Sequence, residues 1–303
     1  MAISCNCEVT PRVYSYGNSA PEVPVGDQRK RIEDEEYLND RTIGQMDLPV
    51  CESIGKRAFE GSSVTGVYAP SCVTVDDRAF YGCNKLLDVD LSSATSIGSS
   101  AFYGAYVETS GPVYWDFSGV SVIKDNAFYG VSSYSQSPIM IDISSVTEVG
   151  YRAFRDVPFW KKDETPRELI LPYCETIADQ GFFNYSSDSR SRLTLLDLPS
   201  IKTIGEQAFR CIGNDGTQTL RIRLGPNCTF IGGDVFRDWG DTNYIDIYSY
   251  ATTPPILGGY FNSTAGTLYT KPRKIYVPAE SVNLYKTAQY WTGYSDRIEA
   301  IPT

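Results

Sequence analysis

Carboxylates, cysteines and tyrosines are the residues of this chain that could carry chemistry, because its 303 residues include no histidine. The lack of histidine removes the commonest general base near neutral pH, the Ser-His and Cys-His nucleophile pairs, and histidine-ligated zinc. Chemistry that uses carboxylates alone remains open, and glycoside hydrolysis is the main example. The candidate carboxylates stand in short stretches of alternating polar and apolar residues: Asp90, Asp116, Asp142, Asp197 and Asp246.

An internal repeat positions these aspartates. Its anchor is an aliphatic residue five positions before a phenylalanine, with a small residue directly ahead of that phenylalanine, as in Ile97, Ala101 and Phe102. Eight copies follow one another at spacings of 21 to 28 residues, with their rings at Phe59, Phe80, Phe102, Phe128, Phe154, Phe182, Phe209 and Phe236. The alternating stretch before each anchor predicts a short strand with one buried face. One such unit cannot bury its own apolar face, so we predict a solenoid of stacked units with a parallel sheet along one side.

Aligning the copies predicts which side chains face inward and which face outward. The strand positions eight and six residues before the anchor, such as Val89 and Leu91, form two inward columns, and the phenylalanines form a third. We expect the small residue before each phenylalanine to let backbones approach closely. The position between the two inward strand columns then faces outward, and it holds Asp47, Tyr68, Asp90, Asp116, Asp142, Ile170, Asp197, Arg223 and Asp246. The neighbouring outward column holds Gln45, Asp88, Tyr114, Met140, Glu168, Arg221 and Tyr244.

Three interpretations of this outward face stay open. In the first interpretation, aspartate is simply tolerated at a solvated position, where it also prevents one sheet from pairing with another. Alternatively, aromatic residues among polar groups form a recognition face for sugars or protein loops. In the third interpretation, two carboxyl groups on adjacent strands are separated by about 5 to 5.5 Å, as retaining glycosidases need. The regular spacing singles out no pair of carboxylates with different environments, which catalysis would require.

A stripe of tyrosines is a second candidate for contact with a partner. Tyr81, Tyr103 and Tyr129 each follow the phenylalanine of consecutive repeats. Aromatic side chains with a polar tip suit contact surfaces, so the stripe is either a binding surface or a cover over neighbouring loops.

The cysteines follow the repeat. Cys51, Cys72, Cys174 and Cys228 occupy one repeat position, which other copies fill with alanine, valine or isoleucine. Exchange with small apolar residues indicates buried, unpaired thiols, which suit a protein made in a reducing compartment. We therefore predict no metal site and no cofactor. The pair Cys5 and Cys7 lies outside the repeat, and its role stays open.

The repeat resembles the BspA-like leucine-rich repeat family in the stretches "VDLSSATSIGSSAFYGA" and "YAPSCVTVDDRAFYGC". The resemblance covers residues 43–250 and implies a leucine-rich-repeat solenoid of about eight repeats. Residues 251–303 resemble the terminal unit that closes such arrays, with a predicted strand at Lys274–Val277 and a predicted helix over 279–289. Residues 1–42 do not repeat, and we interpret them as a cap or an attachment segment.

Charge and hydropathy exclude several classes of partner. The net charge of −10 opposes binding to nucleic acid, and no apolar run is long enough to insert into a membrane. The N-terminal stretch has neither the basic nor the apolar region of a signal peptide. We expect synthesis in the cytoplasm, followed by either retention there or release by another route, as for virion proteins at lysis.

The leading hypothesis is a non-enzymatic recognition or adhesion protein. Proteins that resemble this family are displayed on bacterial surfaces, and similar short arrays occur in phage tail and fibre proteins. We therefore expect a virion or cell-surface location and a protein or glycan partner on a bacterial surface. Residues 1–42 would bind other virion proteins, and a homo-oligomer is left open. The alternatives are a carboxylate-dependent glycan depolymerase and a purely structural decoration of a particle.

Overall fold

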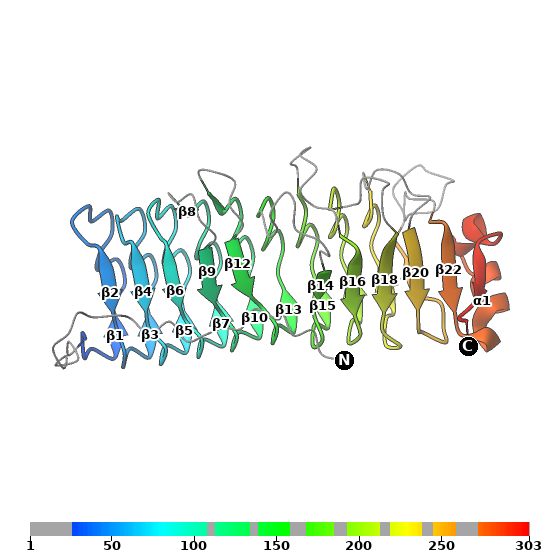
Figure 1. Cartoon of the computed structure of the whole chain (residues 1–303), viewed down its shortest axis with the longest axis horizontal. Coiled ribbons are helices and arrows are strands. Elements are labelled where there is room, and N and C mark those ends of the chain that lie inside the picture. The colour runs from blue at the N-terminus through cyan, green and yellow to red at the C-terminus, as the bar shows by residue number, and fades with distance from the viewer. Residues whose placement is uncertain are drawn as a thin grey trace.

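The chain forms an elongated solenoid, in which each coil lies beside the next along one axis (Figure 1). The structure is a computed structural model that describes residues 26–107, 113–133, 139–157, 168–184, 193–212, 219–237, 245–258 and 272–302. Every strand pair in these ranges is parallel, as stacked repeats require. The predicted solenoid is confirmed.

The repeat anchors lie in a sheet of ten very short strands along one side of the coil. In order, the strands are β1 (Arg31–Ile32), β3 (Ser53–Ile54), β5 (Thr74–Val75), β7 (Ser96–Ile97), β10 (Val122–Ile123), β13 (Glu148–Val149), β15 (Thr176–Ile177), β17 (Thr203–Ile204), β19 (Phe230–Ile231) and β21 (Ile256–Leu257). The anchors are buried and the residues before them are partly or fully exposed, which is the alternation expected of a sheet with one face on the core.

This sheet extends past both ends of the predicted array of residues 43–250. Its first strand, β1, pairs Ile32 with Ile54, and Tyr37 stacks on Phe59 with ring centroids 5.1 Å apart. Residues 31–37 therefore belong to a further copy of the repeat, in which Glu36 and Tyr37 replace the small residue and the phenylalanine. These two replacements hid the copy from the sequence alignment. At the other end, β21 adds an anchor at Leu257.

The longer strands form a second side of the coil and carry the outward columns. One sheet holds β2 (Gln45–Asp47), β4 (Gly66–Tyr68), β6 (Asp88–Asp90), β9 (Val113–Asp116) and β12 (Ile139–Asp142). Another holds β14 (Glu168–Ile170), β16 (Leu195–Leu198), β18 (Leu220–Leu224), β20 (Ile245–Ser249), β22 (Lys274–Val277) and β23 (Ile298–Ala300). The short strands β8 (Tyr106–Val107) and β11 (Ser132–Ser133) pair with each other only, among the residues described.

The phenylalanine turns form the third side of the coil. Their rings stack in one column from Tyr37 to Phe236, for example Phe102 on Phe128 at 5.2 Å between centroids. From Tyr37 to Phe209, the backbone N–H of each ring residue donates to the carbonyl of the residue before the next ring in the following coil, as Phe102 does to Ala127 at 2.7 Å. This ladder satisfies backbone groups that a buried turn would otherwise leave unpaired.

Glycine follows the anchor in several coils, and it marks a close approach between coils that we did not predict. A Cβ atom at Gly98 would lie 2.4 Å from the carbonyl carbon of Asp76, and one at Gly205 would lie 2.4 Å from the nitrogen of Asp179. These contacts are far shorter than van der Waals distance and involve backbone of the preceding coil. The "IG" of the repeat is therefore a packing requirement.

The cysteine column is buried, as predicted. Cys51, Cys72, Cys174 and Cys228 are at most 2% exposed, and they form no disulfide. Burial raises the pKa of Cys174 and of Cys228 to about 12, because removing a thiolate from water is unfavourable. Cys83 is equally buried, and its pKa is also raised to about 12 by burial. Cys5 and Cys7 lie outside the described residues.

We expect these buried thiols to react very slowly with dithionitrobenzoate at about pH 8, because side chains that are at most 2% exposed are out of reach of the reagent. The raised pKa of Cys83, Cys174 and Cys228 adds to this protection, because the thiolate is the reactive form. The hydrogen bond to Cys72 lowers the pKa of Cys51, so its protection depends on burial alone. The test uses a variant in which Cys5, Cys7 and Cys211 are replaced by serine, so that only Cys51, Cys72, Cys83, Cys174 and Cys228 remain. Little reaction should occur in the folded protein, and all five thiols should react in urea. Rapid labelling of any of them in the folded protein would contradict their placement.

The C-terminal unit closes the open end of the solenoid. The strand β22 has the bounds predicted for it, and β23, which was not predicted, pairs with it in parallel. The 3₁₀ helix η2 (Ala279–Ser281), the helix α1 (Val282–Thr287) and the 3₁₀ helix η3 (Trp291–Tyr294) replace the single predicted helix. Tyr285 and Trp291 are buried edge to face, and the Trp291 Nε1–H donates to the carbonyl of Pro255 at 2.8 Å. The unit therefore packs on the last coil.

Candidate binding surface on the outward sheet face

The predicted column of aspartates exists in the first of the two longer-strand sheets. Asp90 is the register partner of Asp116, and Asp116 is the partner of Asp142. Tyr68 precedes Asp90 in the same column. Adjacent parallel strands lie about 4.8 Å apart, so three carboxylates of like charge follow one another along the sheet.

Each of these aspartates has a local structural role that sequence reasoning missed. The Asp90, Asp116 and Asp142 Oδ1 atoms accept hydrogen bonds from the backbone N–H two residues later, at 3.2, 2.9 and 3.0 Å. Such a bond stabilises the turn that ends the strand. The signal was present in the sequence as an aspartate two residues before a serine in all three coils. The repetition of aspartate thus has a structural explanation, and the three carboxylates share one kind of environment.

A second set of aspartates joins neighbouring coils. Asp77 lies two residues after its anchor, and its Oδ1 accepts a hydrogen bond from the Ser99 N–H of the next coil at 2.8 Å. Asp34, Asp125 and Asp179 make the equivalent bond to the coil that follows each of them. These aspartates therefore stabilise the stack and are not candidates for ligand binding.

Asp197 and Asp246 differ from the three aspartates above. Asp197 is the register partner of Arg223, whose Nη1 lies 3.5 Å from the Asp197 Oδ2. Asp246 was predicted in the same column as Arg223, and this was wrong. The register pairs Asp246 with Arg221, and Tyr248 takes the position beside Arg223. Tyr248 stacks in turn on Tyr276, with ring centroids 4.7 Å apart.

Asp246 is also unsuited to bind a ligand. It is only 4% exposed, and both of its carboxylate oxygens accept hydrogen bonds from Arg273. The strong charged pair accounts for the burial of this aspartate, because a buried carboxylate needs such a partner.

Exposed aromatic residues lie on the same face as the column of aspartates. Tyr114 is 54% exposed and is the register partner of Met140 on the next strand. Tyr68 is 38% exposed and lies beside Asp90. Tyr244, the last aromatic residue predicted for this face, lies outside the described residues. The first of the longer-strand sheets therefore combines exposed tyrosines with carboxylates.

The tyrosine stripe lies on the third side of the coil, away from this face. Tyr81 stacks on Tyr103 with centroids 5.0 Å apart, and Tyr103 stacks on Tyr129 at 4.8 Å. The guanidinium of Arg78 covers Tyr81 at 4.1 Å from the ring centroid, and that of Arg155 lies 5.5 Å from Tyr129. Burial by these neighbours raises the pKa of Tyr103. The ring faces are thus occupied within the protein, and only ring edges and hydroxyl groups are left for a partner.

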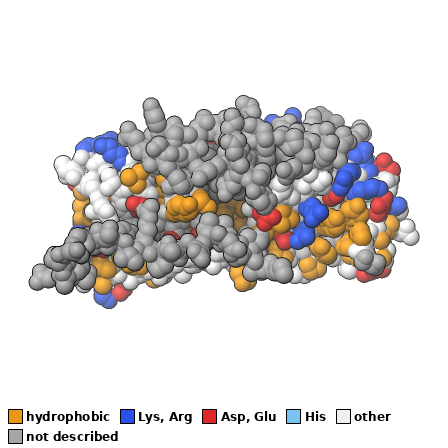
Figure 2. Space-filling view, in the orientation of Figure 1, with side chains coloured by type: hydrophobic (Ala, Val, Ile, Leu, Met, Phe, Trp, Pro, Cys, Tyr) orange, Lys and Arg blue, Asp and Glu red, His pale blue; other side chains and the backbone are white. Residues whose placement is uncertain are grey.

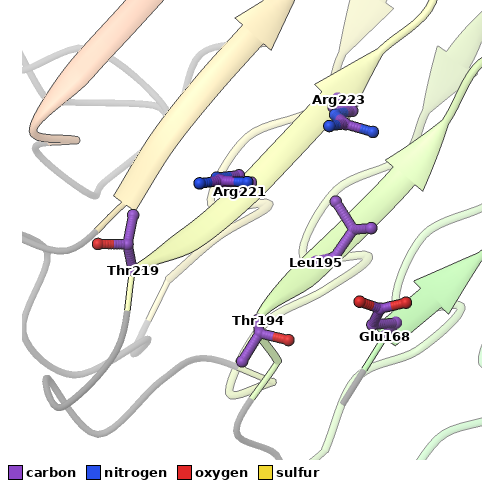
Figure 3. A pocket seen from close by; sticks show the side chains of 6 residues that line it. All are labelled: Glu168, Thr194, Leu195, Thr219, Arg221 and Arg223. Atoms are coloured by element: carbon purple, nitrogen blue, oxygen red, sulfur yellow. The ribbon is translucent and has the colours of Figure 1, made fainter. Parts of the chain in front are cut away.

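A small polar hollow lies on the outward face of the second longer-strand sheet, and we did not predict it. It has a volume of about 230 Å³, and its lining residues are Glu168, Thr194, Leu195, Thr219, Arg221 and Arg223. These side chains come from β14, β16, β18 and the residues just before β16 and β18 (Figure 3). Lysine and arginine side chains gather on this part of the surface (Figure 2). Two arginines on alternate positions of "RIR" are the signal that could have indicated the hollow.

Neither a metal cluster nor a membrane helix is found where the structure describes the chain. Within those ranges no group of three or more cysteine, aspartate or glutamate side chains could hold a metal ion. No helix there is both long and apolar enough to cross a membrane.

Stacked coils with parallel sheets, a buried aliphatic anchor and a column of rings define this protein as a leucine-rich-repeat solenoid. Its sequence matches the family described as BspA type leucine rich repeat region, in 6 copies, over residues 11–135 and 121–256. The chain belongs to this family. Comparison with curated proteins finds no match.

Two solved structures are similar to this chain. One is a leucine-rich repeat protein from Bacteroides ovatus, with 17% sequence identity and a TM-score of 0.38, over 90% of this chain and 76% of the other. The other is the pneumococcal vaccine antigen PcpA, with 12% identity and a TM-score of 0.34, over 89% of this chain and 75% of that one.

Proposed function

We propose that this protein is a non-enzymatic recognition protein, which binds a glycan or a protein on a bacterial surface through the outward face of its longer strands. The observation that supports this proposal is the exposure of Tyr114 and Tyr68 beside Asp90 and Asp116 on that face. The turn bonds explain the aspartates, but among the described residues no comparable bond accounts for the exposed tyrosines. Tyrosines among polar groups are typical of binding surfaces.

We propose a role without catalysis because Asp90, Asp116 and Asp142 make the same turn bond in three successive coils. A pair of catalytic carboxylates needs two different environments, so that one carboxyl group stays protonated while the other is ionised. The proposed location is the surface of a virion or of a bacterial cell, with the N-terminal segment as the attachment.

The proposal is tested by replacing Tyr114 with alanine and measuring binding to bacterial cells and to an array of bacterial surface glycans. We expect an affinity loss of about tenfold or more, because an exposed tyrosine at the centre of a contact contributes at least about 1.4 kcal/mol. Tyr173→Ala is the matched control, because Tyr173 is 61% exposed but lies in the turn after β14, outside the outward columns.

Equal binding by both variants and the unchanged protein would contradict the placement of the binding surface. Release of reducing ends from a bound polysaccharide, abolished in Asp116→Asn or Asp142→Asn, would instead establish the depolymerase alternative. Stable association with virion proteins in the absence of any surface ligand would favour a purely structural role.

A further inference from the structure

We propose that the hollow on the second longer-strand sheet binds one carboxylate-bearing sugar unit of an acidic saccharide, with Arg221 as the main contact for the carboxylate. This inference rests on the proposed function, because it names the ligand class for one part of the same outward face. The lining of the hollow combines two guanidinium groups, two hydroxyl groups and one carboxylate on a surface of paired strands.

Arg221 is available for an anionic ligand. Its side chain is exposed, and where the chain is described no carboxylate forms an ion pair with it. The register places Asp246 beside Arg221, but both oxygens of Asp246 are bonded to Arg273. The guanidinium of Arg221 therefore lacks the partner that its strand neighbour would supply. An exposed guanidinium can accept a carboxylate in a bidentate pair.

Arg223 adds a second positive charge at the same end of the hollow. Its Nη1 lies 3.5 Å from the Asp197 Oδ2, which is a long contact, and its side chain is 42% exposed. A contact of this length with the half-buried Asp197 involves one of the donors of Arg223, so Arg223 retains other donors for a ligand. Glu168 and Asp197 balance the charge of the two arginines overall, but both arginines lie on β18 and Glu168 lies two strands away on β14. The positive charge is therefore concentrated at the β18 side of the hollow.

The remaining lining groups suit hydroxyl groups. Glu168, Leu195 and Arg221 are register partners on three successive strands. Two strand spacings of about 4.8 Å separate Glu168 from Arg221 by about 10 Å, which leaves room for one sugar ring above Leu195. The Glu168 carboxylate can accept hydrogen bonds from sugar hydroxyls, and the Thr219 hydroxyl can both donate and accept. A ligand with a carboxylate at one end and hydroxyls at the other matches this arrangement.

The hollow favours a sugar unit over an acidic peptide. Peptides bind by adding a strand to a free edge, by placing apolar side chains in a groove or, when acidic, by contact with a cluster of arginines. A run of carboxylates is disfavoured here, because Glu168 lines the same hollow as the two arginines and repels further negative charge. The strands β16 and β18 are paired on both sides, and Leu195 is the single apolar residue among the lining residues. The volume of about 230 Å³ is smaller than a drug-sized site of about 300 to 1,000 Å³, as one sugar ring requires.

Isothermal titration calorimetry on the full chain tests this inference. The probes are oligomers of galacturonate, glucuronate and mannuronate, their methyl esters, and a poly-glutamate peptide. We expect at least one uronate oligomer to bind, with affinity at least about tenfold lower for its methyl ester and for Arg221→Gln, because a charge-assisted hydrogen bond is lost. Arg221→Lys should give an intermediate affinity, since it keeps the charge without the planar fork.

Arg41→Gln is the charge-matched control, because Arg41 is exposed and lies far along the chain from the lining residues. Its affinity should equal that of the unchanged protein, and circular dichroism and urea midpoints should show that every variant is folded. The absence of binding by all three uronates would overturn the inference, as would equal binding of the methyl esters or of Arg221→Gln. Poly-glutamate that binds as tightly as the uronates would overturn the sugar assignment. In each case Tyr114-dependent binding to cells would still support the proposed function.

Discussion

Replacing Phe102 with alanine should lower the free energy of unfolding by about 3 to 5 kcal/mol, the range for a buried aromatic ring cut back to a methyl group. Phe102 is fully buried and has ring contacts on several sides. It stacks on Phe80 at 4.9 Å and on Phe128 at 5.2 Å between centroids. The rings of Trp115 and Phe117 also lie 5.4 Å from it, one tilted and one edge to face. The neighbouring rings are held by the backbone ladder on the third side and by the paired strands, so they cannot move in to fill the cavity.

Urea unfolding followed by circular dichroism measures this loss, and Tyr103→Ala is the control. Tyr103 is the next residue and stacks on two rings, but it lies on the outside of the coil and is half-buried. Its loss should cost about 0.5 to 1.5 kcal/mol, the value of an aromatic pair beyond burial. A Phe102→Ala variant as stable as Tyr103→Ala would refute the role of the ring column as the core of the array.

Replacing Gly225 with alanine should cost about 3 kcal/mol or more, since overpacking against rigid backbone is expensive. A Cβ atom at this position would lie 1.8 Å from the carbonyl oxygen of Pro199 and 2.5 Å from its carbonyl carbon. The Gly225 N–H also donates to the carbonyl of Leu198 at 3.0 Å, so the two coils cannot separate without losing this bond. The variant should unfold at a clearly lower urea concentration.

The comparison for this variant is Gly82→Ala. Gly82 has a φ of +65°, and no atom lies within 4 Å of a Cβ added there. Alanine there meets only backbone strain, which costs about 1 to 2 kcal/mol. If Gly225→Ala were no more destabilising than Gly82→Ala, the close contact between coils at Pro199 would be wrong.

The position of Gly225 also explains an irregularity in the repeat. Leu224 pairs in register with Leu198, yet its anchor, Ile231, follows seven residues later, whereas Ile204 follows Leu198 by six. The extra residue is absorbed in the turn that begins at Gly225. Alignment to the anchor placed Leu224 one residue out of phase, although the strand itself is in phase with its neighbour.

The sequence predicted the inward columns and the parallel stack because anchor, small residue and ring recur at fixed offsets. It missed the copy at Ile32 because Glu36 and Tyr37 do not have the types that the other copies share. It misplaced Asp246 because "YIDIYSY" alternates over its whole length. A shift of two residues keeps every side chain on its own face, so alternation alone cannot fix the register.

The candidate site was only partly predictable for a different reason. The column of aspartates follows from a count of positions, and the structure contains it. The hollow depends on which arginine is bonded to which carboxylate. Arg273 reaches Asp246 from a neighbouring coil, and this leaves Arg221 exposed. Such pairing between side chains is not encoded in the spacing of the repeat.

The ladder on the third side has a mechanical consequence. Within the described ranges, the ladder joins each coil to the coil before it and the coil after it, through bonds such as that from Phe102 to Ala127. A pulling force between the two ends of the array would therefore act on these contacts in series, and the end coils would peel away one at a time. The work of extension would be divided among many small steps, each releasing about one repeat of chain. A solenoid attached at one end and bound to a ligand at the other would lengthen gradually under flow, and the force on the bound ligand would stay low.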